Sequence, residues 1–287
     1  MLIIGEKING TRKLVNKAVL ERDAAHIRHL AVSQVEAGAD ALDINAGTLP
    51  DREPEDIIWL INTVQEVVDK PLCLDSPNPE ALLAGISVTR QAPIINSISL
   101  EEQRIRQVLP IVAKNGCRVL ALALDGSTIP SSSEGRMAVI RRLFEETRKA
   151  GVKDEDVFVD ALIMSVATES EACLITLATM HAIRAEYPMA HLIGGLSNVS
   201  FGLPVRTLLN RAFLTLAIEA GLDSAIMDPT DRGLMETLYA TNAILGLDPY
   251  CAHYSRAFRA GKIGPTLEKR KTGKKKHGTA LPFSINQ

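Results

Sequence analysis

The sequence predicts a single-domain (β/α)8 TIM barrel, an α/β fold in which eight parallel strands alternate with eight helices. Three observations predict it. Short apolar runs alternate eight times with longer amphipathic segments. The short runs are almost continuously apolar, as expected for parallel strands that are covered on both faces. The eight units occupy about 250 residues, the usual length of this barrel, in a chain of 287 residues that is 46% hydrophobic.

The predicted strands are the apolar runs, and the predicted helices are the amphipathic segments between them. Glycine or proline follows most of the helices and marks their ends. The expected strands are Leu2–Glu6, Ala41–Asn45, Leu72–Asp75, Pro93–Ser97, Val119–Asp125, Val157–Ile163, His191–Gly194 and Ser224–Asp228. The expected helices are Asp23–Ala37, Glu53–Val68, one that opens at Asn78-Pro79, Glu101–Lys114, Glu134–Ala150, Glu169–Ala185, Val205–Ala220 and Asp231–Leu245.

The chain is expected to form one barrel over residues 1–262, because no linker or change of composition interrupts it before Gly261. A doubly wound open sheet is the alternative, but no Gly-x-Gly-x-x-Gly motif follows a strand. Residues 263–287 differ, since lysine and arginine cluster at 269–271 and 274–276 beside glycine and proline. This composition predicts a basic, flexible C-terminal tail, with an arm that docks an acidic protein partner as the alternative.

Composition argues against several classes of partner. A net charge of −2 and 4% aromatic residues speak against binding nucleic acid or an anionic membrane. No apolar run reaches the roughly 20 residues of a membrane span, and no signal-peptide pattern opens the chain. The four cysteines lack metal-ligand or redox spacing, and three lie in apolar runs that are typical of buried thiols. We therefore expect a cytoplasmic protein without a tightly bound metal.

Carboxylates and carboxamides stand at or just after the end of every predicted strand. They are Glu6, Asn9, Asp43, Asn45, Asp75, Asn78, Asn96, Asp125, Asp160, Asn198 and Asp228. In a closed parallel barrel these strand ends converge on the face that carries the active site. The sequence thus predicts a barrel mouth that is lined by these groups, with almost no cations or histidines.

Some of these side chains have a simpler explanation. Asp228 precedes Pro229, and Asp125 precedes Gly126, so both are expected to cap or turn the chain. Asp160 has apolar neighbours on both sides and is expected to lie within its strand. A carboxylate buried there needs hydrogen-bond partners, which favours a ligand role for Asp160 and, by similar placement, for Asp75 and Asn96.

The ring of polar groups favours a flat heterocycle that is rich in N–H donors. Phosphate is disfavoured because anions require arginine, lysine or bare helix N-termini. A metal is disfavoured because the carboxylates lie on separate strands without a histidine pair. Glycoside chemistry is disfavoured because aromatic platforms are missing. A carboxylate accepts two parallel hydrogen bonds from an amino group and its neighbouring ring nitrogen. Asparagine both donates and accepts, so it can pair with an edge of the ring that carries a donor and an acceptor.

At these same positions the sequence resembles the pterin-binding methyltransferases, in particular the methyltetrahydrofolate:corrinoid protein methyltransferases. The resemblance covers roughly residues 1–262. The motifs that carry it are GEKING (5–10), LDINAG (42–47), LDSPNPEAL (74–82), INSIS (95–99), DALIMSVATE (160–169) and GGLSNVSFGLP (194–204). The resemblance implies a homodimeric barrel that holds tetrahydrofolate or 5-methyltetrahydrofolate as substrate. It also implies a separate corrinoid protein that presents its cobalt to the mouth.

The resemblance also implies roles for individual residues. Asp75, Asn96 and Asp160 match the residues that hold the pterin, and Asn198 matches the asparagine that contacts nitrogen-5, the methyl-carrying atom. Further pocket positions are Met164, Gly195, Ser197, Arg206 and Ile226, and mouth or supporting positions are Glu6, Asp43 and Asn45. A simple surface arginine at the start of a helix is the alternative for Arg206. Gly194 and Gly195 are expected to let the backbone approach the ring.

Two other functions stay open at this point. One is condensation chemistry like that of dihydropteroate synthase, which requires cations late in the barrel; the seventh strand carries no lysine, and the eighth carries no Arg-x-His. The other is a non-catalytic folate-binding protein. The direction of methyl transfer also stays open, with acetyl-CoA, O-demethylation and methylamine-type metabolism as candidate settings. No acid is evident beside Asn198, so proton exchange at nitrogen-5 is expected to pass through water.

Overall fold

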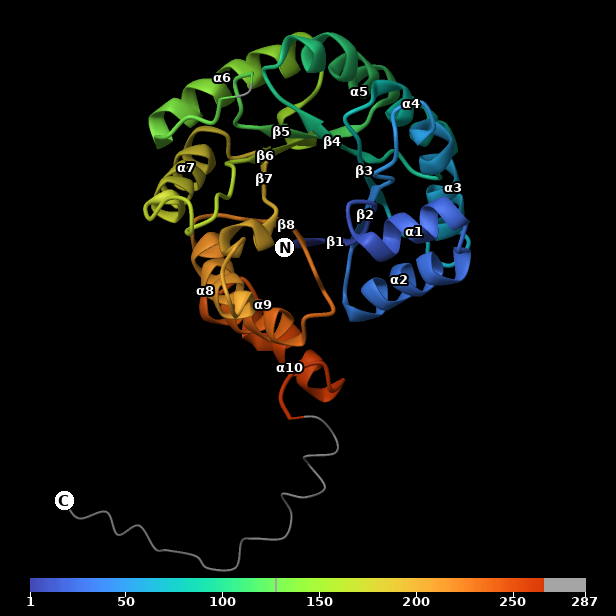
Figure 1. The fold of residues 1–287 in the computed structure, drawn as a ribbon. Helices are drawn as coiled ribbons and strands as arrows, with labels where there is room; N and C mark the ends of the chain where they lie inside the picture. The colour runs from blue at the N-terminus through green and yellow to red at the C-terminus, as the bar shows by residue number, and fades with distance from the viewer. Residues whose placement is uncertain (127, 266–287) are drawn as a thin grey trace, which may run out of the picture.

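The chain folds into a barrel of eight parallel strands surrounded by helices (Figure 1), which confirms the predicted fold class. The computed structural model describes residues 1–126 and 128–265. The strands are β1 (Leu2–Asn9), β2 (Ala41–Asn45), β3 (Leu72–Asp75), β4 (Ile94–Ile98), β5 (Arg118–Leu122), β6 (Val157–Asp160), β7 (His191–Ile193) and β8 (Ser224–Met227).

The strands are arranged around the barrel in chain order, with β8 beside β1. The ring closes between β7 and β8, where the backbone N–H of Ile226 donates to the carbonyl of Gly194 at 3.1 Å. Gly195 and Ile226 form an isolated parallel bridge at the same place. In a closed ring of eight, β3 and β7 stand on opposite sides, so the residues after these strands face each other across the mouth.

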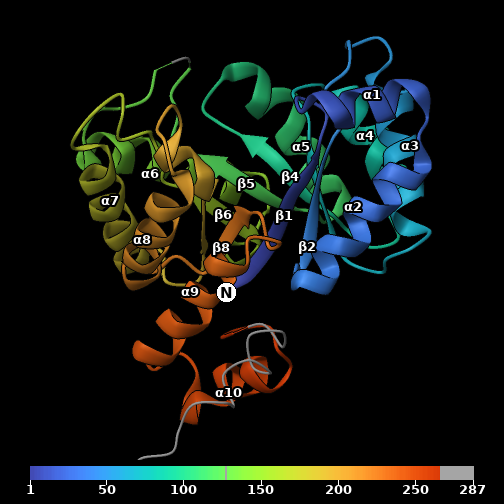
Figure 2. The ribbon, with the colours of Figure 1, turned by 60° about the horizontal axis from the view of Figure 1, so that its bottom comes forward.

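Ten α-helices are present in the described part of the chain. They are α1 (Lys13–Glu21), α2 (Ala24–Ala37), α3 (Glu53–Gln65), α4 (Pro79–Val88), α5 (Leu109–Asn115), α6 (Ser133–Lys149), α7 (Ala172–Glu186), α8 (Arg206–Glu219), α9 (Arg232–Ile244) and α10 (Ala252–Arg259). Eight of them match the predicted helices, whereas α1 and α10 were not predicted. Figure 2 shows α1 at the end of the barrel where the strands terminate and α10 beyond the opposite end, next to α9.

The helix predicted over Glu101–Lys114 is irregular. Arg104–Val108 forms a π-helix, and α5 begins only at Leu109. Pro110 lies in the first turn of α5. Proline has no N–H to donate and clashes with the carbonyl four residues earlier, so a regular α-helix cannot run through this point.

A layer of apolar side chains inside the barrel forms the floor beneath the mouth. These side chains come one from each of the first seven strands and are Ile4, Ala41, Cys73, Ile94, Leu120, Phe158 and Ile193. Successive side chains along a strand point to opposite faces, so the residue two positions later points to the same interior. Five of these seven positions hold polar residues, Glu6, Asp43, Asp75, Asn96 and Asp160, and the other two hold Leu122 and Gly195. The pleat of the strands therefore raises the polar residues directly above the floor.

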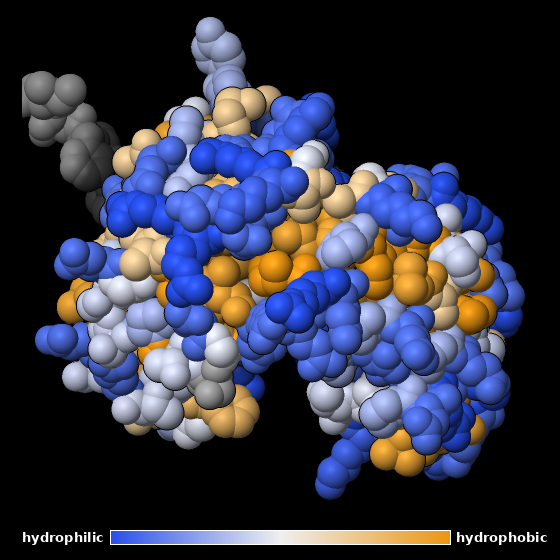
Figure 3. All heavy atoms as spheres, turned by 90° about the horizontal axis from the view of Figure 1, so that it is seen from above, coloured by the Kyte–Doolittle hydropathy of each residue, from blue (hydrophilic) through white to orange (hydrophobic). Residues whose placement is uncertain are grey.

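The carboxyl end of the barrel is hollowed. The space-filling view in Figure 3 shows a notch between two lobes at this end of the molecule. Within the described residues, no helix is long and apolar enough to cross a membrane. The basic cluster predicted as a tail at residues 269–276 lies outside the described residues.

Candidate functional site

A cavity of about 320 Å³ opens at the carboxyl ends of the strands. Its volume is at the lower end of the range for small-molecule sites. It is lined by Glu6, Asn9, Thr11, Arg12, Asp43, Asp75, Asn96, Gly195, Ser197, Asn198 and Ile226. Most of the predicted pocket residues therefore meet in one place, although they come from segments far apart in the sequence. Below, the β2–β4 wall means Asp43, Asp75 and Asn96, and the β7–β1 wall means Glu6, Arg12, Ser197 and Asn198.

On the β2–β4 wall, each carboxylate has an asparagine as its neighbour. Nδ2 of Asn45 donates to Oδ2 of Asp75 at 2.9 Å. Nδ2 of Asn96 approaches Oδ1 of Asp43 at 3.5 Å. Oδ1 of Asn45 is buried and has no hydrogen-bond partner among the described residues. Asn45 does not line the cavity itself, so it acts by orienting Asp75.

Asp43 and Asp75 are poorly compensated by positive charge. Burial raises the pKa of the Asp43 carboxyl well above its usual range, and the neighbouring Asp75 raises it further. The thiol of Cys73 and the amide of Asn96 oppose this effect by hydrogen bonding to Asp43. Burial also raises the pKa of Asp75, while the hydrogen bond from Asn45 and the charge of Arg104 lower it. Asp43 is 3% exposed, and this burial shifts its equilibrium toward the protonated form.

Asp160 ends β6, and the prediction that it lies within a longer strand was wrong. Its Oδ1 accepts the backbone N–H of Leu162 at 2.7 Å, and Leu162 has a φ of 63°. The side chain therefore closes a tight turn, which is a common use of aspartate after a strand. Burial raises the pKa of Asp160 to about 6, opposed by this hydrogen bond and by the charge of Arg136. Among the described residues, nothing hydrogen-bonds to its Oδ2.

Arg136 on α6 holds the turn after Asp160 and was missed in the sequence. Its side chain is 1% exposed. Nη1 donates to the carbonyls of Ala161 and Leu162 at 2.7 and 2.8 Å and to the hydroxyl of Thr176 at 3.1 Å. Nε donates to the carbonyl of Pro130 at 3.1 Å. One buried guanidinium thus connects the segment before α6, the turn after β6, and α7.

The opposite wall carries Asn198 on a short 3₁₀-helix (Leu196–Ser200) that follows β7. A Cβ at Gly195 would lie 3.1 Å from Nδ2 of Asn198, so the glycine leaves room for the carboxamide. A Cβ at Gly194 would lie 2.5 Å from Cδ1 of Ile163. The two glycines therefore leave space for the neighbouring side chains of Ile163 and Asn198. Asn198 is exposed, and no described residue hydrogen-bonds to its carboxamide.

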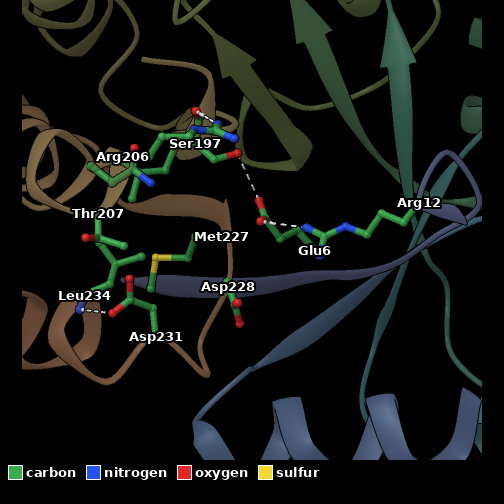
Figure 4. A pocket seen from close by; sticks show the side chains of 11 residues that line it. Glu6, Arg12, Ser197, Arg206, Thr207, Met227, Asp228, Asp231 and Leu234 are labelled. Carbon is green, nitrogen blue, oxygen red and sulfur yellow. Dashed lines mark hydrogen bonds and ion pairs between the residues drawn. The ribbon is translucent and has the colours of Figure 1, made fainter. Parts of the chain in front are cut away.

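Cations lie closer to the mouth than the sequence suggested, so that prediction needs correction. Arg12, between β1 and α1, donates from Nη2 to Oε1 of Glu6 at 3.0 Å. Ser197 donates from Oγ to Oε2 of the same carboxylate at 3.4 Å. Figure 4 shows Glu6 between these two partners. Lys7 pairs with Asp228 at 3.1 Å. The pair of Arg12 with Glu6 was not predicted, because no element was expected in the connection that holds Arg12.

Glu6, Arg12 and Ser197 also line a second cavity of about 220 Å³ next to the first. Arg206, from the first turn of α8, lines this second cavity. Its Nε donates to the hydroxyl of Ser200 at 3.0 Å, and its Nη2 donates to the carbonyl of Ser197. Arg206 is therefore not a simple surface arginine, because it holds the loop that carries Asn198.

Other polar strand-end residues are used locally. Asp125 pairs with Arg142 at 2.7 Å on the surface, and Asn78 caps α4. Met164 follows β6 but is not among the residues that line either cavity at this wall. Within residues 1–126 and 128–265, no group of three or more His, Cys, Asp or Glu side chains has an arrangement that could hold a metal ion.

Known proteins resemble this chain over most of its length. A family profile described as "Pterin binding enzyme" matches residues 5–228. The methylcorrinoid:tetrahydrofolate methyltransferase of Eubacterium limosum is 42% identical over 271 residues, which cover 94% of this chain and 100% of that protein. The methionine synthase of Mycobacterium leprae (strain TN) is 30% identical over 240 residues, which cover 79% of this chain but 20% of that longer protein.

Solved structures show the same fold at lower identity. The dihydropteroate synthase of Xanthomonas albilineans in complex with 7,8-dihydropteroate has a TM-score of 0.65 and 19% identity, covering 86% of this chain and 94% of that chain. The enzyme of Coxiella burnetii in complex with pteroic acid has a TM-score of 0.60 and 13% identity. At these identities the likeness concerns the fold alone. The family profile and the full-length relative go further, and together they show that this chain belongs to the family of pterin-binding enzymes.

Proposed function

We propose that this chain is a methyltransferase that moves a methyl group from the cobalt of a methylated corrinoid, carried by a separate protein, to nitrogen-5 of tetrahydrofolate. The observation that carries the proposal is the 42% identity to the Eubacterium limosum methylcorrinoid:tetrahydrofolate methyltransferase over that protein's whole length. The order of the two substrates in that name supports the direction of transfer. It leaves the ultimate source of the methyl group, such as O-demethylation or a methylamine, open.

The β2–β4 wall and Asp160 suit the pterin ring. A pterin presents an amino group and ring N–H groups along one edge, and carboxylates accept such paired donors. Asp75, Asn96 and Asp160 hold this edge, with Asn45 orienting Asp75 from behind at 2.9 Å. Gly195, Ser197, Arg206, Ile226 and Met164 complete the surroundings of the ring and of the chain that extends from it.

Asn198 contacts nitrogen-5 in this proposal. During transfer the nitrogen lone pair attacks the methyl carbon, and the carbon–cobalt bond breaks with its electron pair left on cobalt. Positive charge develops on nitrogen-5 as the new bond forms. The carbonyl oxygen of a carboxamide can accept a hydrogen bond from the protonated nitrogen, and its amino group can donate to the neutral one. The exposed, unpaired carboxamide of Asn198 is free to make either contact.

Condensation chemistry of the dihydropteroate synthase type fits less well. That reaction releases a diphosphate, which requires unengaged cations. The cations at this mouth are already paired: Arg12 with Glu6, Lys7 with Asp228, and Arg206 with oxygens of the β7 loop. A non-catalytic folate-binding protein would not require the exposed carboxamide of Asn198 opposite the β2–β4 wall.

We further propose a cytoplasmic homodimer. Exposed apolar side chains on one side of the barrel support dimerisation: Leu208 and Leu216 on α8, Ile244 on α9, and Leu247 and Tyr250 after it. Light scattering of the full chain tests this proposal, and a monomeric mass at micromolar concentration contradicts it.

The methyltransferase proposal is tested by mixing the purified chain with tetrahydrofolate and free methylcobalamin. We expect formation of 5-methyltetrahydrofolate, detected chromatographically, together with the absorbance change of demethylated cobalamin. Omission of tetrahydrofolate is the control. A methylated corrinoid protein replaces methylcobalamin in a second arm. The proposal is wrong if neither arm yields methylated folate while calorimetry shows that the chain binds tetrahydrofolate.

A further inference from the structure

Methylation of tetrahydrofolate releases a proton, and the chain needs a group that accepts it. Nitrogen-5 of tetrahydrofolate carries one hydrogen, and after attack on the methyl carbon the nitrogen holds both the hydrogen and the methyl group. The N–H bond must then break, with its electron pair returning to nitrogen. The sequence suggested no partner for this step other than water.

We infer that Glu6 accepts this proton through the hydroxyl of Ser197. The inference rests on the proposed function and on the contact that Asn198 makes with nitrogen-5. In this step Ser197 receives the proton from nitrogen-5 and passes its own hydroxyl proton to Oε2 of Glu6. The carboxylate becomes a carboxylic acid, and no other reactant is needed.

The geometry singles out Glu6 among the carboxylates of the mouth. Ser197 directly precedes Asn198 in the chain, and its hydroxyl donates to Oε2 of Glu6 at 3.4 Å. Arg12 holds the other oxygen, Oε1, at 3.0 Å and so keeps Oε2 turned toward the serine. Glu6 and Ser197 line both cavities, and Figure 4 shows the contact between them in the smaller one. The Glu6 side chain is 18% exposed, which leaves a route for the proton to reach solvent.

The other carboxylates nearby are otherwise engaged. Asp228 is paired with Lys7 at 3.1 Å, and Asp231 is paired with Arg211 at 3.2 Å and caps α9. Asp43 and Asp75 belong to the β2–β4 wall. Glu6 is therefore the one carboxylate within the described part of the chain that lines the cavity and hydrogen-bonds to the residue beside Asn198.

The net effect of the groups around Glu6 is a pKa above the usual value of a glutamate, which makes its carboxylate a better proton acceptor. Burial raises the pKa of its carboxyl, the guanidinium of Arg12 lowers it, and the carboxylate of Asp228 raises it again. A carboxylate whose pKa is raised toward the working pH is a more effective general base than an ordinary one. The charged groups that face Glu6 from the surrounding elements are Arg12, Asp43, Arg206, Asp228 with its partner Lys7, and Asp231.

The test compares Glu6→Gln with the wild-type protein in single-turnover methyl transfer from methylcobalamin to tetrahydrofolate, followed across pH. In the wild type we expect the rate to fall as pH drops through the pKa of Glu6, because the protonated carboxylic acid cannot accept another proton. This fall is the acidic limb of the pH–rate profile. Glutamine preserves the shape and still accepts from Arg12 through its amide oxygen. Its amide nitrogen, in the place of Oε2, donates to the Ser197 hydroxyl and cannot take a proton. We expect its rate to be about 10²-fold lower, the lower end of the usual effect of a general base, and to lose the acidic limb.

Further variants separate proton transfer from positioning. Ser197→Ala is also expected to lower the rate of methyl transfer. In Glu6→Ala, added formate is expected to restore part of the activity. Affinity for tetrahydrofolate, measured by calorimetry, is expected to stay within a few-fold in Glu6→Gln. Glu186→Gln is the matched control, because Glu186 forms an exposed pair with Arg141 at 2.7 Å far from the mouth; it is expected to leave rate and pH profile unchanged.

Two results would overturn the inference. The first is a Glu6→Gln rate within threefold of wild type at all pH values, and the second is an acidic limb that persists unchanged in this variant. Both leave the proposed function standing, since the wild type still methylates tetrahydrofolate. A wild-type protein that binds folate but transfers no methyl group refutes the proposed function and this inference with it.

Discussion

The two walls of the cavity hold their carboxylates in different electrostatic surroundings. On the β2–β4 wall, Asp43 and Asp75 have carboxamides and each other as neighbours, and their pKa values are raised. On the β7–β1 wall, Glu6 lies between a guanidinium and a hydroxyl. The first arrangement suits hydrogen bonding to a neutral heterocycle. The second suits a charge that changes during reaction, and this difference supports the proposed division of binding and chemistry between the two walls.

The largest effect that this comparison predicts is at Asn198. Asn198→Ala removes the one group proposed to follow the charge on nitrogen-5. We expect kcat to fall about 10²-fold or more, as when a charge-stabilising donor is deleted from an active site. Turnover with methylcobalamin measures this, and calorimetry of folate binding serves as the control. Methyl transfer at a near-normal rate would show that the β7–β1 wall does not act on the reacting atom.

Asp160→Ala tests the proposed pterin contact of Asp160, which follows β6 and is not among the residues that line the cavity. We expect tetrahydrofolate affinity to weaken by about 1–3 kcal/mol, because a ligand donor loses its buried acceptor. This corresponds to roughly a 5- to 150-fold higher Kd. Asp160→Asn keeps an oxygen for the N–H of Leu162 and so separates loss of the ligand contact from loss of the turn. Unchanged affinity in the alanine variant would remove Asp160 from the pterin site.

The pH dependence of folate binding sharpens the assignment of Asp160. Its pKa of about 6 is raised above the usual aspartate value, so the free protein binds a proton there as pH falls below 6. The ligand's N–H donors favour the ionised form, and binding must then displace that proton. Affinity should fall by up to about tenfold per pH unit below 6. Asp160→Asn should abolish this slope, and a slope that survives would point to another group.

The smallest effect is expected at Asp43. Burial and the neighbouring Asp75 favour its protonated form, and a carboxamide closely resembles a protonated carboxyl in size and polarity. Asp43→Asn should therefore change folate affinity and kcat by less than about threefold, a difference below 1 kcal/mol. Asp75→Asn is the comparison variant and should weaken binding more. Equal losses in the two variants would mean that Asp43 acts as an anion.

The sequence was sufficient to predict the barrel and much of the lining of the cavity at its mouth. Strands of a parallel barrel all end on one face, and a period of two places each polar residue above an apolar one. Asp43, Asp75 and Asn96 follow directly from that pattern. The resemblance to pterin-binding enzymes then supplied Asn198, which stands in a loop where strand periodicity indicates nothing.

Arginine contacts were not predictable in the same way. Arg12 reaches back six residues to Glu6 from a connection that was expected to be irregular. Arg136 reaches from α6 to the turn after β6, 25 residues away. A long side chain can cross from one element to another, and no local pattern indicates which acceptor it meets. The turn at Asp160 was missed because its apolar neighbours look like a continuing strand.

The four hydrogen bonds of Arg136 have a consequence for the thermodynamics of ligand binding. They tie the backbone directly after Asp160 to the segment before α6 and to α7 in the ligand-free protein. A segment that is already ordered loses little conformational entropy when the pterin docks, so more of the interaction free energy appears as affinity. The buried guanidinium thus preorganises a carboxylate to which it makes no hydrogen bond of its own.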